Sequence, residues 1–296
     1  MTPAATTADR DVAGPPVTRG AHAPATPAPA RPGWTLTWRD EFDGPDVDTS
    51  KWEVLTRRDN ANREQQIYVP EQATIARGSD GRSVLRVTAT DEPLDGRAYR
   101  SARLESWYTQ RYGRFECRAK LPATQGMWPA FWLLPRPADD WPHRGEIDVL
   151  EGKGRDPHWT SSAYHFADPA TRQHRYVARD YRPRDAAGRP IDLTAGFHVY
   201  AVEWEPGELR FYFDEEPEPY HRVTRADAPV SDHAMSVVLN LAVGGWFDGD
   251  PDETTVFPQH FEIDYVRAWR RSTTTAASPA DSTAAAPGSG QAGATH

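Results

Sequence analysis

The chain has 296 residues, a formal net charge of −9 at pH 7 and one cysteine. This length allows one large β domain or two ordinary domains. The acidic balance, without a block of lysine and arginine, argues against a nucleic-acid partner, and no apolar run is long enough to span a membrane. The lone Cys117 excludes an intrachain disulfide, and the alternating residues around it predict a small strand residue, not a catalytic thiol.

Both ends of the chain differ in composition from its middle. Residues 1–32 are rich in Ala, Pro and Thr, and residues 272–296 are rich in Ser, Thr, Ala and Gly. Such segments lack the apolar side chains that build a core, so we expect both to be disordered. The first segment also has no apolar run of the kind that a secretion signal needs. One folded unit is therefore expected over residues 33–271.

Within this unit, apolar and polar residues alternate with a period of two. The alternating runs are residues 34–38, 83–89, 113–121, 197–204, 209–213, 235–243 and 261–269. A hairpin turn sequence, Glu205-Pro206-Gly207-Glu208, joins two of them. Many short strands separated by turn signals, with no long helical pattern, predict an all-β sandwich or barrel.

The densest acidic motif is GEIDVLE, residues 145–151. Its β-branched residues favour a strand, on which Glu146 and Asp148 share one face because side chains alternate. Glu151 lies an odd number of residues further on and would face the other side. One inserted residue, a β-bulge near residues 149–150, would return Glu151 to the first face.

Two glutamates on one strand face suit a retaining glycosidase, in which the two carboxyl groups lie roughly 5–5.5 Å apart. One carboxylate attacks the sugar, and the other, kept protonated, donates to the leaving oxygen and later activates water. Crowding of like charges raises at least one carboxyl pKa, as an acid that works near neutral pH requires. A solvated acidic edge strand is the alternative interpretation of so short a motif.

The residues before the motif are aromatic. WPAFWLLP occupies residues 128–135 and Trp141 follows. Aromatic faces serve as platforms for sugar rings, which favours a sugar site here. Burial in the core is the alternative use of the same side chains.

Ordered blocks from Trp38 to Trp269 resemble glycoside hydrolase family 16, in particular its laminarinase-like (endo-β-1,3-glucanase) branch. The blocks are WRDEFDG (38–44), NREQQIYVP (62–70), SARLES (101–106), YGRFECRAKLP (112–122), GMWPAFWLLP (126–135), GEIDVLE (145–151), FHVYAVEW (197–204), LNLAVGG (239–245) and FEIDYVRAW (261–269). The resemblance implies a concanavalin-like β-jelly-roll sandwich of two curved antiparallel sheets, with a substrate cleft on the concave face.

The resemblance also implies roles for individual residues. Glu146 matches the nucleophile, Asp148 matches the carboxylate that orients it, and Glu151 matches the general acid/base. No cofactor is expected for catalysis. Asp264, in FEIDYVRAW, matches a residue that in many members holds a structural calcium, and oxygen ligands suit that ion.

Further residues match or border the sugar-binding positions of the family. Core packing is the alternative for the tryptophans, a surface salt bridge is the alternative for Arg103, and a structural role is the alternative for His165. The expected substrate-binding residues are Trp128, Trp132, Trp141, Arg103, His165, Asn62, Glu64 and Trp246.

The expected activity is retaining endo-hydrolysis of a β-1,3-glucan or a mixed β-1,3/1,4-glucan. The chain departs from the family at Arg63, at Trp246-Phe247, and at Tyr164 and Phe166, all near expected sugar-binding positions. Three alternatives therefore stay open: an agarase-like galactan hydrolase, a transglycosylase and a non-catalytic glycan-binding module. Because polysaccharides are met outside the cell, we expect a secreted protein despite the missing signal, and a monomer whose partner is the polysaccharide.

Overall fold

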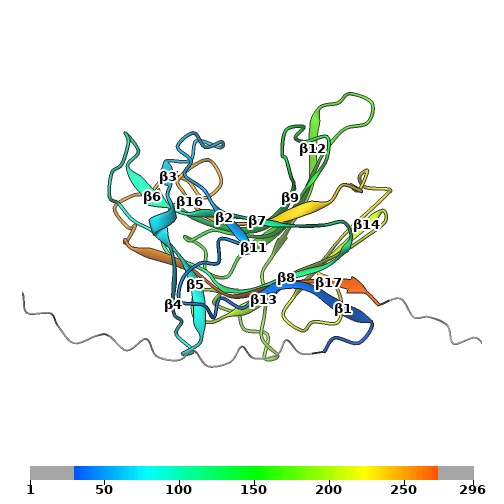
Figure 1. Cartoon of the computed structure of the whole chain (residues 1–296), viewed down its shortest axis with the longest axis horizontal. Coiled ribbons are helices and arrows are strands. Elements are labelled where there is room, and N and C mark those ends of the chain that lie inside the picture. Colours follow the sequence, from blue (N-terminus) through cyan, green and yellow to red (C-terminus); the bar gives the residue numbers. More distant parts are fainter. Residues whose placement is uncertain (1–29, 273–296) are drawn as a thin grey trace, which may run out of the picture.

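The computed structural model describes residues 30–272, which form two large β-sheets packed face to face (Figure 1). The folded unit predicted for residues 33–271 lies within this range. The segments predicted to be disordered, 1–32 and 272–296, lie outside it apart from residues 30–32 and Ser272. Ser272 donates its backbone N–H to the carbonyl of Gly33 at 2.9 Å, so the two ends of the described chain meet.

One sheet has eight strands in the order β15-β14-β13-β8-β17-β5-β4, with β1 paired to β17. Its strands are β1 (Trp34–Asp40), β4 (Ala73–Arg77), β5 (Ser83–Ala89), β8 (Gly113–Lys120), β13 (His198–Glu205), β14 (Glu208–Phe213), β15 (His221–Thr224) and β17 (Gln259–Arg271). The neighbours on this path pair in antiparallel fashion, as is usual where sheets pack into a sandwich.

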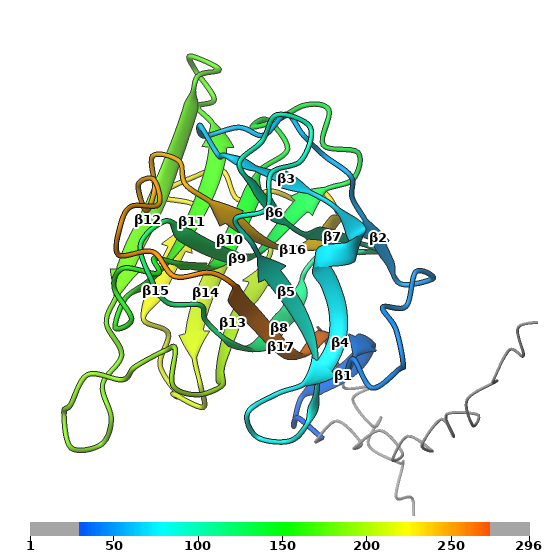
Figure 2. The same ribbon diagram turned by 90° about the vertical axis from the view of Figure 1, so that its left-hand side faces the viewer.

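The other sheet has seven strands in the order β12-β11-β10-β9-β16-β7-β2. Its strands are β2 (Trp52–Val54), β7 (Arg103–Gln110), β9 (Met127–Pro135), β10 (Glu146–Gly152), β11 (Thr160–Ala167), β12 (His174–Tyr181) and β16 (Met235–Val243). A small parallel pair, β3 (Gln66–Tyr68) and β6 (Tyr99–Ser101), and the short 3₁₀ helix η1 (Pro70–Gln72) complete the described elements. The β11–β12 hairpin stands out from the body of the molecule in both ribbon views (Figures 1 and 2).

The core lies between the two sheets and is built from the alternate residues of each strand. On β8, Phe115 and Cys117 are fully buried, and on β9, Phe131 and Leu133 are fully buried. Burial raises the pKa of the Cys117 thiol well above its ordinary value. The prediction that Cys117 is a small buried strand residue is therefore confirmed.

The all-β sandwich predicted from the period of two is confirmed. The predicted hairpin is also present, because Glu205 lies opposite Glu208 across β13 and β14, and Gly207 has a φ of 84° that suits glycine in a tight turn. The strand β12 was not predicted, because it is an edge strand whose side chains are nearly all exposed. Such a strand shows no alternation between buried and exposed residues.

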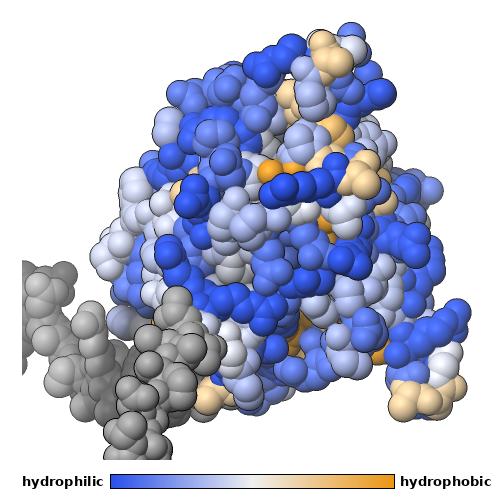
Figure 3. Space-filling view, turned by 90° about the vertical axis from the view of Figure 1, so that its right-hand side faces the viewer, coloured by the Kyte–Doolittle hydropathy of each residue, from blue (hydrophilic) through white to orange (hydrophobic). Residues whose placement is uncertain are grey.

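The face of the molecule seen from the right-hand side of Figure 1 is mainly hydrophilic, with apolar residues only in small separate areas (Figure 3). None of the helices in the described range has the length and apolar character needed to cross a membrane.

Candidate active site

The acidic motif forms β10, near the middle of the seven-stranded sheet. Against β9, Asp148 pairs with Trp132 and Leu150 pairs with Phe131, so two steps on β10 correspond to one step on β9. A matching irregularity lies between Asp148 and Glu151 on the side of β11. The predicted bulge at residues 149–150 is therefore confirmed.

The bulge decides which way the side chains of β10 point. Val149 and Leu150 are both buried in the core, although they are consecutive. Alternation resumes after them, and Glu151 returns to the face that carries Glu146 and Asp148. The motif thus brings three carboxyl groups to one face of the sheet.

Glu146 lies at the start of β10 and is half-buried. The indole Nε1 of Trp141 donates a hydrogen bond to its Oε2 at 2.9 Å. Burial raises the pKa of Glu146 to about 8, and the neighbouring charge of Asp148 adds to the rise. Gly145 sets the entry to the strand with a φ of 82°, and a Cβ there would lie 2.9 Å from the Cβ of Ser231.

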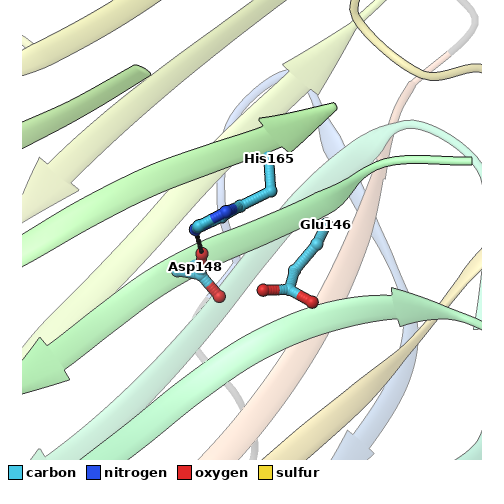
Figure 4. A group of neighbouring side chains, drawn as sticks. All are labelled: Glu146, Asp148 and His165. Carbon is cyan, nitrogen blue, oxygen red and sulfur yellow. Dashed lines mark ion pairs between the residues drawn. The ribbon is translucent and has the colours of Figure 1, made fainter. Parts of the chain in front are cut away.

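Asp148 is the most buried of the three carboxyl groups, with 5% of its surface exposed. Its Oδ2 lies 3.1 Å from Nε2 of His165, which reaches across from β11 (Figure 4). Burial raises the pKa of Asp148 to about 8. A protonated His165 opposes that rise, because a positive charge beside a carboxylate favours its ionised form.

Glu151 receives two hydrogen bonds from neighbouring strands. Nε1 of Trp128 donates to its Oε1 at 3.1 Å, and Oγ of Ser161 donates to its Oε2 at 3.3 Å. Burial is the largest cause that raises the pKa of Glu151 to about 8, and the charge of Asp148 is the second. A carboxyl group with such a pKa holds its proton at neutral pH and can act as a general acid.

A hydrogen-bonded chain runs from β9 through β16 to β3 and the loop before it. Nε1 of Trp132 donates to Oδ1 of Asn240 at 2.7 Å, and Nδ2 of Asn240 donates to the hydroxyl of Tyr68 at 3.3 Å. The Tyr68 hydroxyl donates in turn to Oε2 of Glu64 at 3.2 Å. The guanidinium of Arg103 covers the ring of Trp132 at 4.7 Å.

Arg103 makes the salt bridge that was the alternative to sugar binding. Its Nε and Nη2 donate to the same oxygen, Oε1 of Glu105, at 2.9 and 2.6 Å. With 8% of its surface exposed, Arg103 has little area left for a ligand. A contact between Arg103 and sugar stays a prediction.

Asn62 and Trp246 meet beyond the end of β16. Nε1 of Trp246 donates to Oδ1 of Asn62 at 3.1 Å, and Nδ2 of Asn62 donates to Oε1 of Glu64 at 3.3 Å. Trp246 packs edge-on against Trp128 at 5.7 Å.

The tryptophans differ in how much surface they offer. Trp246 is 64% exposed and Trp141 is 46% exposed, whereas Trp128 is 8% exposed. Phe247 stacks on Trp128 at 4.5 Å and accounts for part of that burial. Trp141 and Trp246 therefore present free aromatic faces, while Trp128 serves Glu151 through its N–H.

The structure does not place Asp264 with the other candidate residues. It lies on β17 of the eight-stranded sheet, where its Oδ2 accepts hydrogen bonds from Arg118 at 2.7 Å and from Arg82 at 3.1 Å. Two guanidinium groups on one carboxylate oxygen neutralise it and repel a dication. These residues do not fit a calcium ion at Asp264, and calcium elsewhere in the protein stays a prediction.

Within residues 30–272, one group of three potential metal-ligating side chains has its atoms within 4.8 Å, namely Glu146, Asp148 and His165. We assign no metal to it. Glu146 accepts from Trp141, and Asp148 is paired with His165, so the protein itself supplies a partner for each carboxyl group.

Sequence reasoning missed several residues that contact the candidate site. Ser161 donates a hydrogen bond to Glu151, and Asn240 accepts one from Trp132. His174 shares a hydrogen bond with His165. Asn240 lies in the block LNLAVGG, so its place in a family motif was a usable signal. His174 lies outside every block quoted from the sequence, and only the pairing of β11 with β12 reveals it.

The chain is similar to known proteins along most of its length. Residues 50–267 match the model of Glycosyl hydrolases family 16. A beta-glucanase of Rhodothermus marinus is 35% identical over 261 residues, which cover 81% of this chain and 86% of that protein. A glucan endo-1,3-beta-glucosidase of Cryptopygus antarcticus is 30% identical over 264 residues, which cover 81% and 93%.

A solved structure agrees with these sequence matches. The catalytic domain of an endo-1,3-beta-glucanase (laminarinase) from Thermotoga petrophila RKU-1 has a TM-score of 0.70 and 31% identity, covering 80% of this chain and 98% of that chain. The jelly-roll fold implied by the resemblance is thereby confirmed. The chain belongs to glycoside hydrolase family 16, and its relatives there include beta-glucanases and laminarinases.

Proposed function

We propose that this protein is a retaining endo-glycosidase that hydrolyses β-1,3-glucan or mixed β-1,3/1,4-glucan. The observation that carries the proposal is the bulge in β10, because it brings Glu146 and Glu151 to one face with different hydrogen-bond donors on each. Two similar proteins are described as endo-1,3-beta-glucanases or endo-1,3-beta-glucosidases, which supports the choice of substrate.

In the first step, the carboxylate of Glu146 attacks the anomeric carbon and the glycosidic C–O bond breaks. Glu151 gives its proton to the departing oxygen. Trp141 holds Oε2 of Glu146, so Oε1 is the oxygen that is free to attack. Trp128 and Ser161 hold the two oxygens of Glu151 in place beside the leaving group.

In the second step, Glu151 takes a proton from a water molecule, which attacks the same carbon and releases Glu146. Two displacements at one carbon retain its configuration. Asp148 lies between the two glutamates on the strand, and its charge is the second cause of the raised pKa at each of them. When it is ionised, Asp148 thus helps to keep on Glu151 the proton that the first step requires.

The first experiment measures the release of reducing sugar from laminarin, mixed-linkage β-glucan, xyloglucan, agarose and carrageenan, with Glu146→Gln as the matched control. We expect release from laminarin or mixed-linkage glucan, and a rate lower by roughly 10²-fold or more in the variant, since a positioned catalytic group contributes about 10²–10⁴-fold. Release by the Glu146→Gln variant at the wild-type rate would remove Glu146 from the mechanism.

The same experiment tests the alternatives. Release from agarose or carrageenan alone would keep the mechanism and replace the substrate by a galactan. Longer products from short oligosaccharides would indicate transglycosylation, because a sugar hydroxyl then reaches the intermediate before water does. Binding to the glycans without any release would favour a non-catalytic binding module.

We further propose that the protein acts outside the cell and as a monomer. The reason for the proposed location is the substrate, since polysaccharides of this size are met outside the cell. Light scattering on the purified full chain tests the oligomeric state, and assay of the culture medium of the producing cell tests the location.

A further inference from the structure

A second histidine lies directly behind His165. Nδ1 of His165 and Nε2 of His174 are 2.8 Å apart, and the two rings are nearly coplanar, with 11° between their planes and 5.0 Å between their centres. This is the geometry of two imidazoles that share a hydrogen bond edge to edge. Only one of the two facing nitrogens can carry the proton, so one ring donates and the other accepts.

His174 contacts the partners of both Asp148 and Glu146. Its hydrogen-bond partner, His165, faces Asp148 at 3.1 Å through the opposite nitrogen. Its ring also lies 4.7 Å from the ring of Trp141, whose N–H donates to Glu146. One side chain on β12 therefore touches the two groups that support two of the three carboxyl groups.

We propose that His174 is a positioning residue: it accepts the Nδ1–H of His165 and thereby fixes the ring of His165 with its Nε2 beside Asp148. This inference rests on the proposed glycosidase function. His165 presents a proton to both neighbours at once only as the imidazolium, which has a proton on each nitrogen. The hydrogen bond to His174 and the ion pair with Asp148 each favour the charged ring, because an interaction made by the charged form stabilises that form.

The charge on His165 matters because burial otherwise disfavours the ionised form of the carboxyl groups at this site. Positive charge on His165 lowers the pKa of both Glu146 and Glu151, against the rise that burial causes. His174 suits the role of neutral acceptor, because burial and the nearby His165 lower its own pKa.

Other groups that titrate near the pair are few. They are Glu146, Asp148 and Glu151 on β10 and Tyr176, which stacks on both histidines from β12. The side chain that packs on His174 from the loop before β10 is the uncharged Trp141. A change at His165 on substituting His174 is therefore attributable to their shared hydrogen bond.

His174 could instead serve only to pack its ring against its neighbours. Two variants separate this structural role from the hydrogen bond to His165. His174→Phe keeps an aromatic ring against Trp141 but removes the acceptor. His174→Gln supplies a carboxamide oxygen that can accept from His165. Arg175→Ala is the control, because Arg175 is the next residue on β12, points to the opposite face and has only a weak contact of 3.8 Å with Asp168.

The first readout needs no substrate. The imidazole N–H signals of His165 are recorded by NMR in the full chain and in each variant. We expect the signal of the Nδ1–H that is hydrogen-bonded to His174 to be lost to exchange with water in His174→Phe, because its acceptor is gone. We expect the signal to persist in His174→Gln and to be unchanged in Arg175→Ala. An unchanged signal in His174→Phe, with the melting temperature preserved, overturns the proposal.

The second readout is the pH profile of kcat/KM on the substrate found in the panel. His174→Phe should move the acid limb, which reports the ionisation of Glu146, to higher pH and lower kcat more than it alters KM, because the charge of His165 lowers the pKa of Glu146. A fall in activity with an unmoved acid limb would mean a structural role and overturn the proposal. If the wild-type protein releases sugar from no substrate, the glycosidase proposal fails, and the NMR signals still decide whether His174 holds the proton of His165.

Discussion

Each of the three carboxyl groups on β10 has its own polar neighbour. Trp141 donates to Glu146, His165 pairs with Asp148, and Trp128 with Ser161 donates to Glu151. These partners do not offset burial, and the pKa of each carboxyl group is raised to about 8. The cluster therefore keeps protons at neutral pH, as a general acid requires. Loss of those protons at higher pH leaves buried carboxylates, which lower the stability of the folded state.

That cost can be measured with Glu151→Gln, which mimics the protonated side chain. Burial raises the pKa of Glu151 to about 8 in the folded state, from its ordinary value of 4.5. Its stabilising contribution is therefore complete below pH 4.5 and is lost as the pH rises towards 8, because the folded state binds the proton more tightly than the unfolded state.

We expect the variant to match the wild type in stability near pH 4 and to exceed it by on the order of 1 kcal/mol at pH 8. Urea unfolding at several pH values measures the difference. A variant that loses stability relative to the wild type as the pH rises would show that Glu151 is ionised in the folded state.

At the scale of the element, the bulge in β10 is what makes the motif a site. Val149 and Leu150 both enter the core, and this single departure from alternation sets where Glu151 stands relative to Trp128 and Ser161. If either Val149 or Leu150 were removed, the strand would lose its bulge, and regular alternation would still place the glutamate that follows on the face of Glu146 and Asp148. The bulge therefore fixes the position of the carboxyl group along the strand, and not only its side.

Deletion of Leu150 tests this statement, with Leu150→Ala as the matched control. The deletion restores regular alternation and should keep the glutamate exposed but move it away from Trp128 and Ser161. We expect the activity to fall by roughly 10²-fold or more, the usual contribution of a positioned general acid. Leu150→Ala keeps the bulge and should lose about 2–5 kcal/mol of stability, as large-to-small core changes do, while a folded fraction stays active.

The two variants separate register from packing. Sugar release per folded molecule is measured for each, with circular dichroism to establish the folded fraction. Equal specific activities of the deletion and the substitution would mean that the bulge only fills the core.

At the scale of the whole molecule, two sheets enclose one core and leave polar residues outside (Figures 1 and 3). The only cysteine of the chain, Cys117, lies fully buried in this core on β8, between β13 and β17. Its thiol has a raised pKa, so the reactive thiolate is scarce even when a reagent approaches. Opening of the sandwich is what exposes it.

Labelling of Cys117 by a thiol reagent should therefore report the unfolding of the sandwich. We expect labelling of the native protein at pH 8 to be at least about a hundredfold slower than labelling in denaturant, because the open state of a stable domain is rarely populated. Mass spectrometry of the intact chain over time measures the rate. Rapid labelling of the native protein would mean that the sheets separate locally near β8 without global unfolding.

Much of the fold and part of the site follow from neighbouring residues alone. The alternation along runs such as 83–89 and 113–121 predicts strands, and these runs form β5 and β8. The odd step from Glu146 to Glu151 predicts the bulge that the pairing of β10 shows. The exposed edge strand β12 escaped prediction because its residues have no buried face to reveal.

What the sequence by itself determined is local: the strands, the bulge and the three carboxyl groups on one face, since alternation and the count of residues are properties of the chain. Only the tertiary structure decided which partners those groups meet. Trp132 and Asn240 are 108 residues apart, and Arg118 and Asp264 are 146 residues apart. Such pairs depend on the order of strands in each sheet, which no local pattern encodes. For the same reason the sheet order brings His174 to His165 and gives the carboxylate of Asp264 to two arginines.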